Sequence, residues 1–245
     1  MAFLGLFGGT IEQKIARKKK VMLNEHQQQQ VRQEAIQGLV DFDCPEAIMA
    51  LVERLGVNFR DTIKNEQERE WVSHLLLTHF KARSVEPLKS YISGGTQLAG
   101  ALQCLQELIE DEEYRDFILE TLCRYAPADH RTETAREQLV DALSEIEDEE
   151  IVEPLLPYVL DHCDDVRIKV ISILEQRALA GAKAQEAIAG ALVGVLCDPL
   201  ASGRISRAAG QALVGMRVTL KEWREELEEN LPEGFKLHQN RLQLL

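Results

Sequence analysis

Apolar residues recur at intervals of three and four along most of the chain, which is the spacing of one face of an α-helix. The segment with Ile48, Leu51, Val52 and Leu55 is an example. Strands would instead show apolar and polar residues in strict alternation, and no such run stands out in the sequence. The pattern therefore predicts an all-α fold.

The helical segments repeat at a regular interval. The phrase VEPLLPYVL begins at Val152 and its relative VEPLKSYIS at Val85, about two units of the roughly 33 residues common in helical repeats. A second pair of phrases, around Val31 and Val166, is separated by about four such units. The two intervals agree, so we predict about six helical hairpins. Their paired segments are 24–40 with 45–55, 66–80 with 85–93, 96–109 with 112–125, 131–146 with 150–162, 166–179 with 183–197, and 205–216 with 220–230.

Prolines and tyrosines mark the second helix of several hairpins. Pro45, Pro87 and Pro154 lie at or near its first turn, where a missing amide proton costs little. Tyr91 and Tyr158 follow their prolines by one helical turn, so each ring can pack while its hydroxyl reaches the edge. The duplicated phrase is best explained as a structural consensus.

The motif VRxxAIxxL at residues 31–39, followed by CPEAIMALVERL at residues 44–55, resembles HEAT-like repeats of the PBS-lyase type found in bacterial α-solenoid proteins. The resemblance covers most of residues 24–230 and implies a right-handed superhelix of hairpins, flanked by an extension, 1–23, and a tail, 231–245. It also implies a ladder of Arg and Asp side chains between neighbouring repeats. The expected members are Arg32, Arg167, Asp41, Asp43, Asp148 and Asp165.

The resemblance defines architecture better than function, because many activities share such folds. We predict a non-enzymatic scaffold or adaptor whose concave face binds another protein of unknown identity. In such a stack the second helices line that face, and the candidate contact residues are Glu53, Lys89, Arg124, Tyr158 and His162. Two alternatives stay open: an enzyme-associated subunit such as a phycobilin-lyase-type component, and a peripheral membrane adaptor.

Two enzyme families built on related repeats are not favoured by the sequence. Deoxyhypusine hydroxylase holds iron with paired His-Glu motifs, and no histidine of this chain is followed by Glu. Alkylpurine DNA glycosylases need a basic face with aromatic residues, whereas this chain has a formal charge of -13 and 5% aromatic residues. An excess of 41 acidic over 28 basic residues also disfavours nucleic acid as a partner.

The densest group of ligand-type side chains is LDHCDDVR, residues 160–167. Adjacent residues on a helix point in different directions, whereas a metal ion needs ligands that converge. We interpret the segment as a turn in which Asp164 or Asp165 caps the next helix while Cys163 packs. We therefore predict no catalytic residue, no metal and no cofactor.

The five scattered cysteines favour reduced thiols in a cytoplasmic protein, and no apolar run approaches the roughly 20 residues of a membrane span. The first segment begins with the apolar residues Phe3, Leu4, Leu6 and Phe7. A capping box of Thr10 and Gln13 then opens a helix that carries Lys18, Lys19 and Lys20. It is expected to cap the first hairpin, dock on a partner or contact the inner membrane surface weakly. The apolar tail is expected to fold back or to exchange between two subunits of a homodimer.

Overall fold

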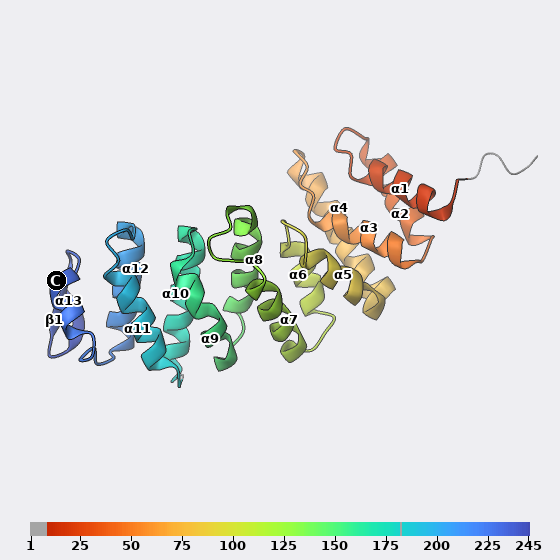
Figure 1. Cartoon of the computed structure of the whole chain (residues 1–245). Coiled ribbons are helices and arrows are strands. Elements are labelled where there is room, and N and C mark those ends of the chain that lie inside the picture. The colour runs from red at the N-terminus through yellow and green to blue at the C-terminus, as the bar shows by residue number, and fades with distance from the viewer. Residues whose placement is uncertain (1–8, 182) are drawn as a thin grey trace, which may run out of the picture. The chain divides into compact units, whose positions relative to one another are not determined.

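The fold is taken from a computed structural model of the whole chain, which describes residues 9–181 and 183–245 (Figure 1). The chain divides into two compact units, Met1–Tyr114 and Arg115–Leu245. Almost every described element is helical. The predicted all-α class, built of helical hairpins, is confirmed.

The first unit consists of helices that pack around α3. Its elements are α1 (Ile11–Met22), α2 (Gln29–Val40), α3 (Pro45–Leu55), α4 (Thr62–His74) with a π-helical and a 3-10 extension (Leu75–Phe80 and Lys81–Ser84), α5 (Val85–Ile92), α6 (Ala99–Gln106) and the start of α7 (Asp111–Cys123). α3 contacts α1, α2, α4, α5 and α6, and Ile48, Leu51 and Leu55 are almost fully buried there. Pro45 opens this helix at its first turn, as its missing amide proton predicts.

The helix α1 covers α2 and α3 and carries the predicted capping box. Gln13 N donates to Thr10 Oγ1 at 3.3 Å, and Thr10 N donates to Gln13 Oε1 at 3.2 Å. Ile15 and Met22 bury the inner face of the helix. The capping box thus sets where the helical part of the N-terminal extension begins.

The second unit repeats the hairpin pattern and ends in two short strands. Its elements are the end of α7, a 3-10 turn (His130–Thr132), α8 (Glu133–Ser144), a 3-10 turn (Glu149–Ile151), α9 (Val152–Leu155), a 3-10 turn (Leu156–Leu160), α10 (Asp164–Leu179), α11 (Gln185–Leu196), α12 (Gly203–Met216), α13 (Arg224–Asn230), β1 (Phe235–His238) and β2 (Arg241–Leu244). α10 packs on α8 and α12, as the neighbouring ribbons show (Figure 1). α9 gives way to a 3-10 turn where Pro157 lacks the amide proton of a continuing α-helix.

The strands at the C-terminus are an element that the sequence analysis missed. Phe235 pairs with Leu244 in an antiparallel hairpin, and Gln239 and Asn240 turn the chain with positive φ values of 49° and 57°. Apolar and polar residues do alternate here, but the run is short. The expectation of no strand is therefore wrong for these residues.

The tail hairpin is anchored on α12. β2 contacts α12, Phe235 is buried, and Leu220 N donates to Asn240 O at 2.7 Å. Gly210 lies against the Phe235 ring, so an added Cβ would overlap the ring. The hairpin therefore depends on the missing side chain at position 210.

Substituting Gly210→Ala is expected to lower the free energy of unfolding by about 1–3 kcal/mol, because the ring must leave its site. Gly194→Ala is the matched control: Gly194 also lies within a helix, with open space around its Cα. There, alanine should stabilise by about 0.5–1 kcal/mol. Thermal unfolding followed by circular dichroism measures both, and equal effects would show that Phe235 does not restrict position 210.

The two tyrosines of the duplicated phrase hydrogen-bond to backbone carbonyls. Tyr91 Oη donates to Gln97 O at 3.1 Å, and Tyr158 Oη lies 2.6 Å from Leu122 O and 3.0 Å from Tyr125 O. Tyr158 is 3% exposed, contrary to the exposed position expected for it, and burial raises the pKa of its hydroxyl. Each tyrosine hydroxyl thus joins two turns of the chain by hydrogen bonding to a backbone carbonyl.

Three of the four aspartates expected in the ladder pair with arginines: Asp43 with Arg83, Asp148 with Arg115, and Asp165 with Arg204. Asp41 instead accepts from Gln37 Nε2 at 3.1 Å. Arg32 instead pairs with Glu68, and Arg167 Nε donates to Val159 O at 2.8 Å. The expectation that Arg32 and Arg167 pair with aspartates is therefore wrong.

No helix among the described residues is long and apolar enough to cross a membrane.

Candidate metal centre

Three ligand-type side chains meet where two turns of the second unit approach each other. His130 lies in the 3-10 turn that leads into α8, and Glu133 is the first residue of that helix. His162 lies in the turn between the Leu156–Leu160 segment and α10. One ligand atom from each of these residues lies within 4.8 Å of the other two. We call these three residues the His–Glu–His cluster.

Local capping explains how the first turn presents its two ligands. Asp129 precedes the 3-10 turn and accepts a hydrogen bond from Arg131 N at 3.1 Å. This fixes the start of the turn, and residues three apart lie on neighbouring positions of a helical surface. His130 and Glu133 therefore share one side of the α8 N-terminus.

The three side chains of the cluster are close together and partly exposed. The rings of His130 and His162 have centroids 3.9 Å apart and an interplanar angle of 63°. His162 Nε2 lies 3.4 Å from Glu133 Oε2. The side chain of His162 is 21% exposed and that of Glu133 is 45% exposed. His130 and the Glu133 carboxylate can thus be reached from solvent, whereas His162 is mostly covered.

The electrostatics favour an ionised carboxylate in the cluster. The pKa of Glu133 is lowered, above all by its hydrogen bond with the Cys163 thiol. Burial raises the pKa of Cys163 itself, so this side chain stays a thiol. Because metal ions bind the deprotonated form, a Glu133 carboxylate that ionises readily is suited to be a ligand.

A buried ion pair lies directly behind the cluster. Arg136 Nε donates to Asp161 Oδ2 at 2.7 Å, and its Nη2 donates to Asp161 Oδ1 at 2.9 Å. Neither side chain is exposed to solvent. Arg136 belongs to α8 and Asp161 precedes His162, so the pair connects the two elements that carry the ligands.

The donor set defines what the cluster can do chemically. Two imidazole nitrogens and one carboxylate oxygen suit zinc, iron and related divalent transition metals. Three protein ligands leave at least one coordination position for water or substrate, which distinguishes catalytic from closed structural sites.

The prediction of no metal site concerned ligands within one segment, residues 160–167. The partners of His162 come from the preceding hairpin, and the Cys163 thiol also meets Glu133. The available sequence signal was the His-x-x-Glu spacing of residues 130–133. The expected caps are also wrong: Asp164 accepts from Ser202 Oγ at 2.7 Å and Asp165 from Arg204 Nη2, also at 2.7 Å.

The residues predicted to contact a partner are distributed over both units. Glu53 accepts from Lys19 Nζ at 2.6 Å, Lys89 Nζ donates to Glu113 Oε1 at 2.6 Å, and Arg124 Nη2 donates to Glu120 Oε1 at 2.6 Å. Tyr158 is buried, and His162 joins the cluster.

The predicted N-terminal docking residues are only partly described. Phe3, Leu4, Leu6 and Phe7 lie outside the described residues. Lys18 and Lys19 are half-buried and Lys20 is exposed, all on α1.

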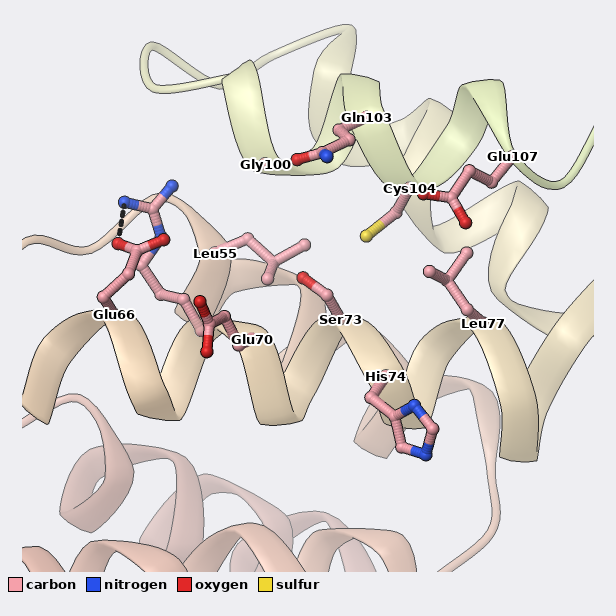
Figure 2. A pocket seen from close by; sticks show the side chains of 11 residues that line it. Leu55, Glu66, Glu70, Ser73, His74, Leu77, Gly100, Gln103, Cys104 and Glu107 are labelled. Carbon is pink, nitrogen blue, oxygen red and sulfur yellow. Dashed lines mark ion pairs between the residues drawn. The ribbon is translucent and has the colours of Figure 1, made fainter.

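The first unit contains a separate cavity of about 280 Å³ between α4 and α6. Figure 2 shows Ser73 of α4 and Leu77 of its π-helical extension facing Cys104 of α6 and Glu107, which follows α6 directly. Burial raises the pKa of the Cys104 thiol, against the effect of its hydrogen bond with Ser73. Among the described residues, the ligand atoms close enough to share a metal ion are those of the His–Glu–His cluster and not those of this cavity.

The fold and the cluster together define a helical-repeat protein with a candidate metal centre. No family model matches the sequence, and no curated protein matches it. Among solved structures, the chain is similar to human deoxyhypusine hydroxylase in complex with glycerol. The identity is 15%, the match covers 89% of this chain and 95% of that one, and the TM-score is 0.34.

These findings correct the prediction of a non-enzymatic scaffold. The matched structure is that of a hydroxylase, although a likeness with a TM-score of 0.34 carries no argument about activity. The correction depends on the His–Glu–His cluster. The scaffold prediction assumed that the chain has no constellation of chemical side chains, and that assumption is wrong.

Proposed function

We propose that the chain binds a divalent transition-metal ion through His130, Glu133 and His162 and acts as a metal-dependent enzyme. The observation that carries the proposal is the convergence of three ligand atoms, from two turns separate in sequence, to within 4.8 Å of one another. The family assignment to PBS-lyase-type HEAT repeats remains a prediction beside it.

The state of His162 supports a metal ion better than a simple ion pair. Its Nε2 is buried and has no hydrogen-bond partner among the described residues. The distance of 3.4 Å to Glu133 Oε2 is longer than a good charged hydrogen bond. A buried polar atom without a partner costs about 1–3 kcal/mol, and a coordinated metal ion would remove that cost.

The chemistry of such a site is Lewis-acid chemistry. A bound metal ion polarises a substrate oxygen or lowers the pKa of its water. The residues of the chain supply the ligands, an entrance from solvent and a carboxylate that ionises readily. These properties favour hydrolytic or related reactions at an accessible site.

Metal binding is the first test. Wild-type protein is expected to bind one Zn²⁺ or Co²⁺, with visible absorption bands for Co²⁺. His162→Ala should weaken binding by about 100-fold or more, since even supporting residues of metal sites contribute 10–100-fold. His26→Ala is the matched control, because His26 also lies beside a glutamate, with Nε2 3.7 Å from Glu25 Oε1, outside the cluster. Absent wild-type binding, or equal binding by His162→Ala, would contradict the proposal.

Catalysis is tested after metal binding. Zinc-loaded wild-type protein is assayed on activated carboxylic and phosphate esters, with zinc-treated His162→Ala as the blank. Turnover above the blank that is lost with a chelator supports the enzymatic part of the proposal. Stoichiometric metal binding without turnover of any ester would reject hydrolysis and retain the metal site.

A further inference from the structure

Building on the proposed metal site, we infer that Arg136 and the Pro127 carbonyl are positioning groups for His162. They hold the imidazole with its proton on Nδ1, so that the bare Nε2 faces Glu133 and His130. The same contacts connect the two turns that carry the ligands. The site is therefore organised before any metal ion arrives.

The Pro127 carbonyl sets the position of the ring proton. Pro127 O accepts a hydrogen bond from the His162 backbone N–H at 3.2 Å and lies 2.9 Å from His162 Nδ1. A carbonyl oxygen can only accept hydrogen bonds. The 2.9 Å contact is therefore favourable when Nδ1 carries a proton, and Nε2 is left as the lone-pair nitrogen.

Arg136 is also close to His162 Nδ1, at 3.1 Å from Nη2, but it does not need that atom as an acceptor. Nη2 carries two protons, and two oxygens are placed to accept them, Asp161 Oδ1 at 2.9 Å and Pro127 O at 3.2 Å. A bare Nδ1 would instead face the carbonyl oxygen, lone pair against lone pair. The contacts together favour the tautomer protonated on Nδ1.

The other end of the guanidinium holds the turn that carries His130. Arg136 Nη1 donates to Asp129 O at 2.6 Å and to Thr132 Oγ1 at 2.7 Å. Asp129 and Thr132 flank His130 and precede Glu133. One buried side chain thus contacts the backbone or side chains of both ligand-bearing turns.

Asp161 completes this arrangement. Its carboxylate neutralises Arg136, which would otherwise place a buried positive charge beside the metal ion. Asp161 Oδ1 also accepts a hydrogen bond from Cys163 N at 2.9 Å, which fixes the backbone on the far side of His162. Groups of this kind hold a ligand in its productive orientation.

The tautomer can be measured directly, with or without metal. Long-range ¹H–¹⁵N correlation spectra at alkaline pH distinguish a protonated from a bare ring nitrogen, and His162→Gln assigns the signals. We expect Nδ1 protonated and Nε2 bare in the metal-free protein, and the Nε2 signal to shift with Zn²⁺. A proton on Nε2 of the neutral ring would overturn the inference.

The positioning role of Arg136 is tested with Arg136→Lys, which keeps the charge and loses the planar fork. We expect the Kd for Zn²⁺ to rise by about 10–100-fold and the Co²⁺ absorption bands to change. Arg204→Lys, at the exposed Arg204–Asp165 pair, should leave both unchanged. Wild-type affinity and spectrum in a folded Arg136→Lys protein would overturn the inference.

A second variant covers the case in which Arg136→Lys does not fold. Thr132→Val removes a single partner of Nη1 at the edge of the site, and a smaller rise in the Kd is expected. Failure of wild-type protein to bind any metal would reject the proposed function. The tautomer measurement would still decide the inference about His162.

Discussion

Replacing Glu68 with glutamine is expected to lower the free energy of unfolding of the first unit by about 3–5 kcal/mol. Glu68 of α4 is 1% exposed and accepts hydrogen bonds from Arg32 Nη2 at 2.7 Å and Arg54 Nη2 at 3.1 Å. The ring of Phe59 lies against both guanidinium groups, at 4.9 and 4.2 Å. Without the carboxylate, two buried cations would face each other with no counter-charge.

The protonation of Arg54 supports this argument. Burial lowers the pKa of its guanidinium, and the hydrogen bond and charge of Glu68 act in the opposite direction. The Glu68 carboxylate thus offsets the free-energy cost of burying a second charged arginine.

The matched control for this prediction is Glu66→Gln. Glu66 is in the same helix, its side chain is 58% exposed, and it lies 3.7 Å from Arg69 Nη1. An exposed pair of this kind contributes at most about 1 kcal/mol. Urea denaturation followed by helical circular dichroism compares the two variants. A loss below 1 kcal/mol for Glu68→Gln would show that the buried cations find other partners.

Substituting Asp161→Asn should affect both stability and metal binding. The amide nitrogen of asparagine would face a guanidinium donor of Arg136, where the carboxylate accepts two hydrogen bonds. Both side chains are fully buried, so we expect a loss of about 3–5 kcal/mol in the free energy of unfolding. Zinc affinity should fall by about 10–100-fold, because the two ligand-bearing turns lose their common partner.

Asp165→Asn separates this effect from a general loss of surface charge. Asp165 pairs with Arg204 at 2.7 Å with both side chains more than half exposed, so its loss should cost at most about 1 kcal/mol. Zinc affinity should not change in this variant. Equal destabilisation by both substitutions would show that the burial of the Arg136–Asp161 pair has no energetic consequence.

The helical hairpins could be predicted from the sequence because the interactions that form a helix join residues close in the chain. Apolar spacing, Pro45 at a helix start and the Thr10–Gln13 capping box each depend on residues within one or two turns of one another. The strands at the C-terminus were not predicted, because each has only four residues and so short an alternation does not stand out in the sequence. Their stability comes from Phe235 packing at Gly210, a contact between distant positions.

The partners of the charged residues could not be predicted in the same way. Arg32 was expected to pair with an aspartate of the ladder and pairs with Glu68. Tyr158 was expected at the surface and is buried, with its hydroxyl bonded to carbonyls of an earlier turn. In both cases the partner lies on another helix, and helical phase alone does not specify it.

The sequence by itself determined the class of the fold and the succession of helical hairpins, because these follow from interactions between residues close in the chain. Only the tertiary structure brings the three side chains of the His–Glu–His cluster together. His130 and Glu133 become neighbours of His162 through the packing of α8 beside α10 and through the buried Arg136–Asp161 pair. The His-x-x-Glu spacing of residues 130–133 is local, but the approach of His162 is a property of three-dimensional packing.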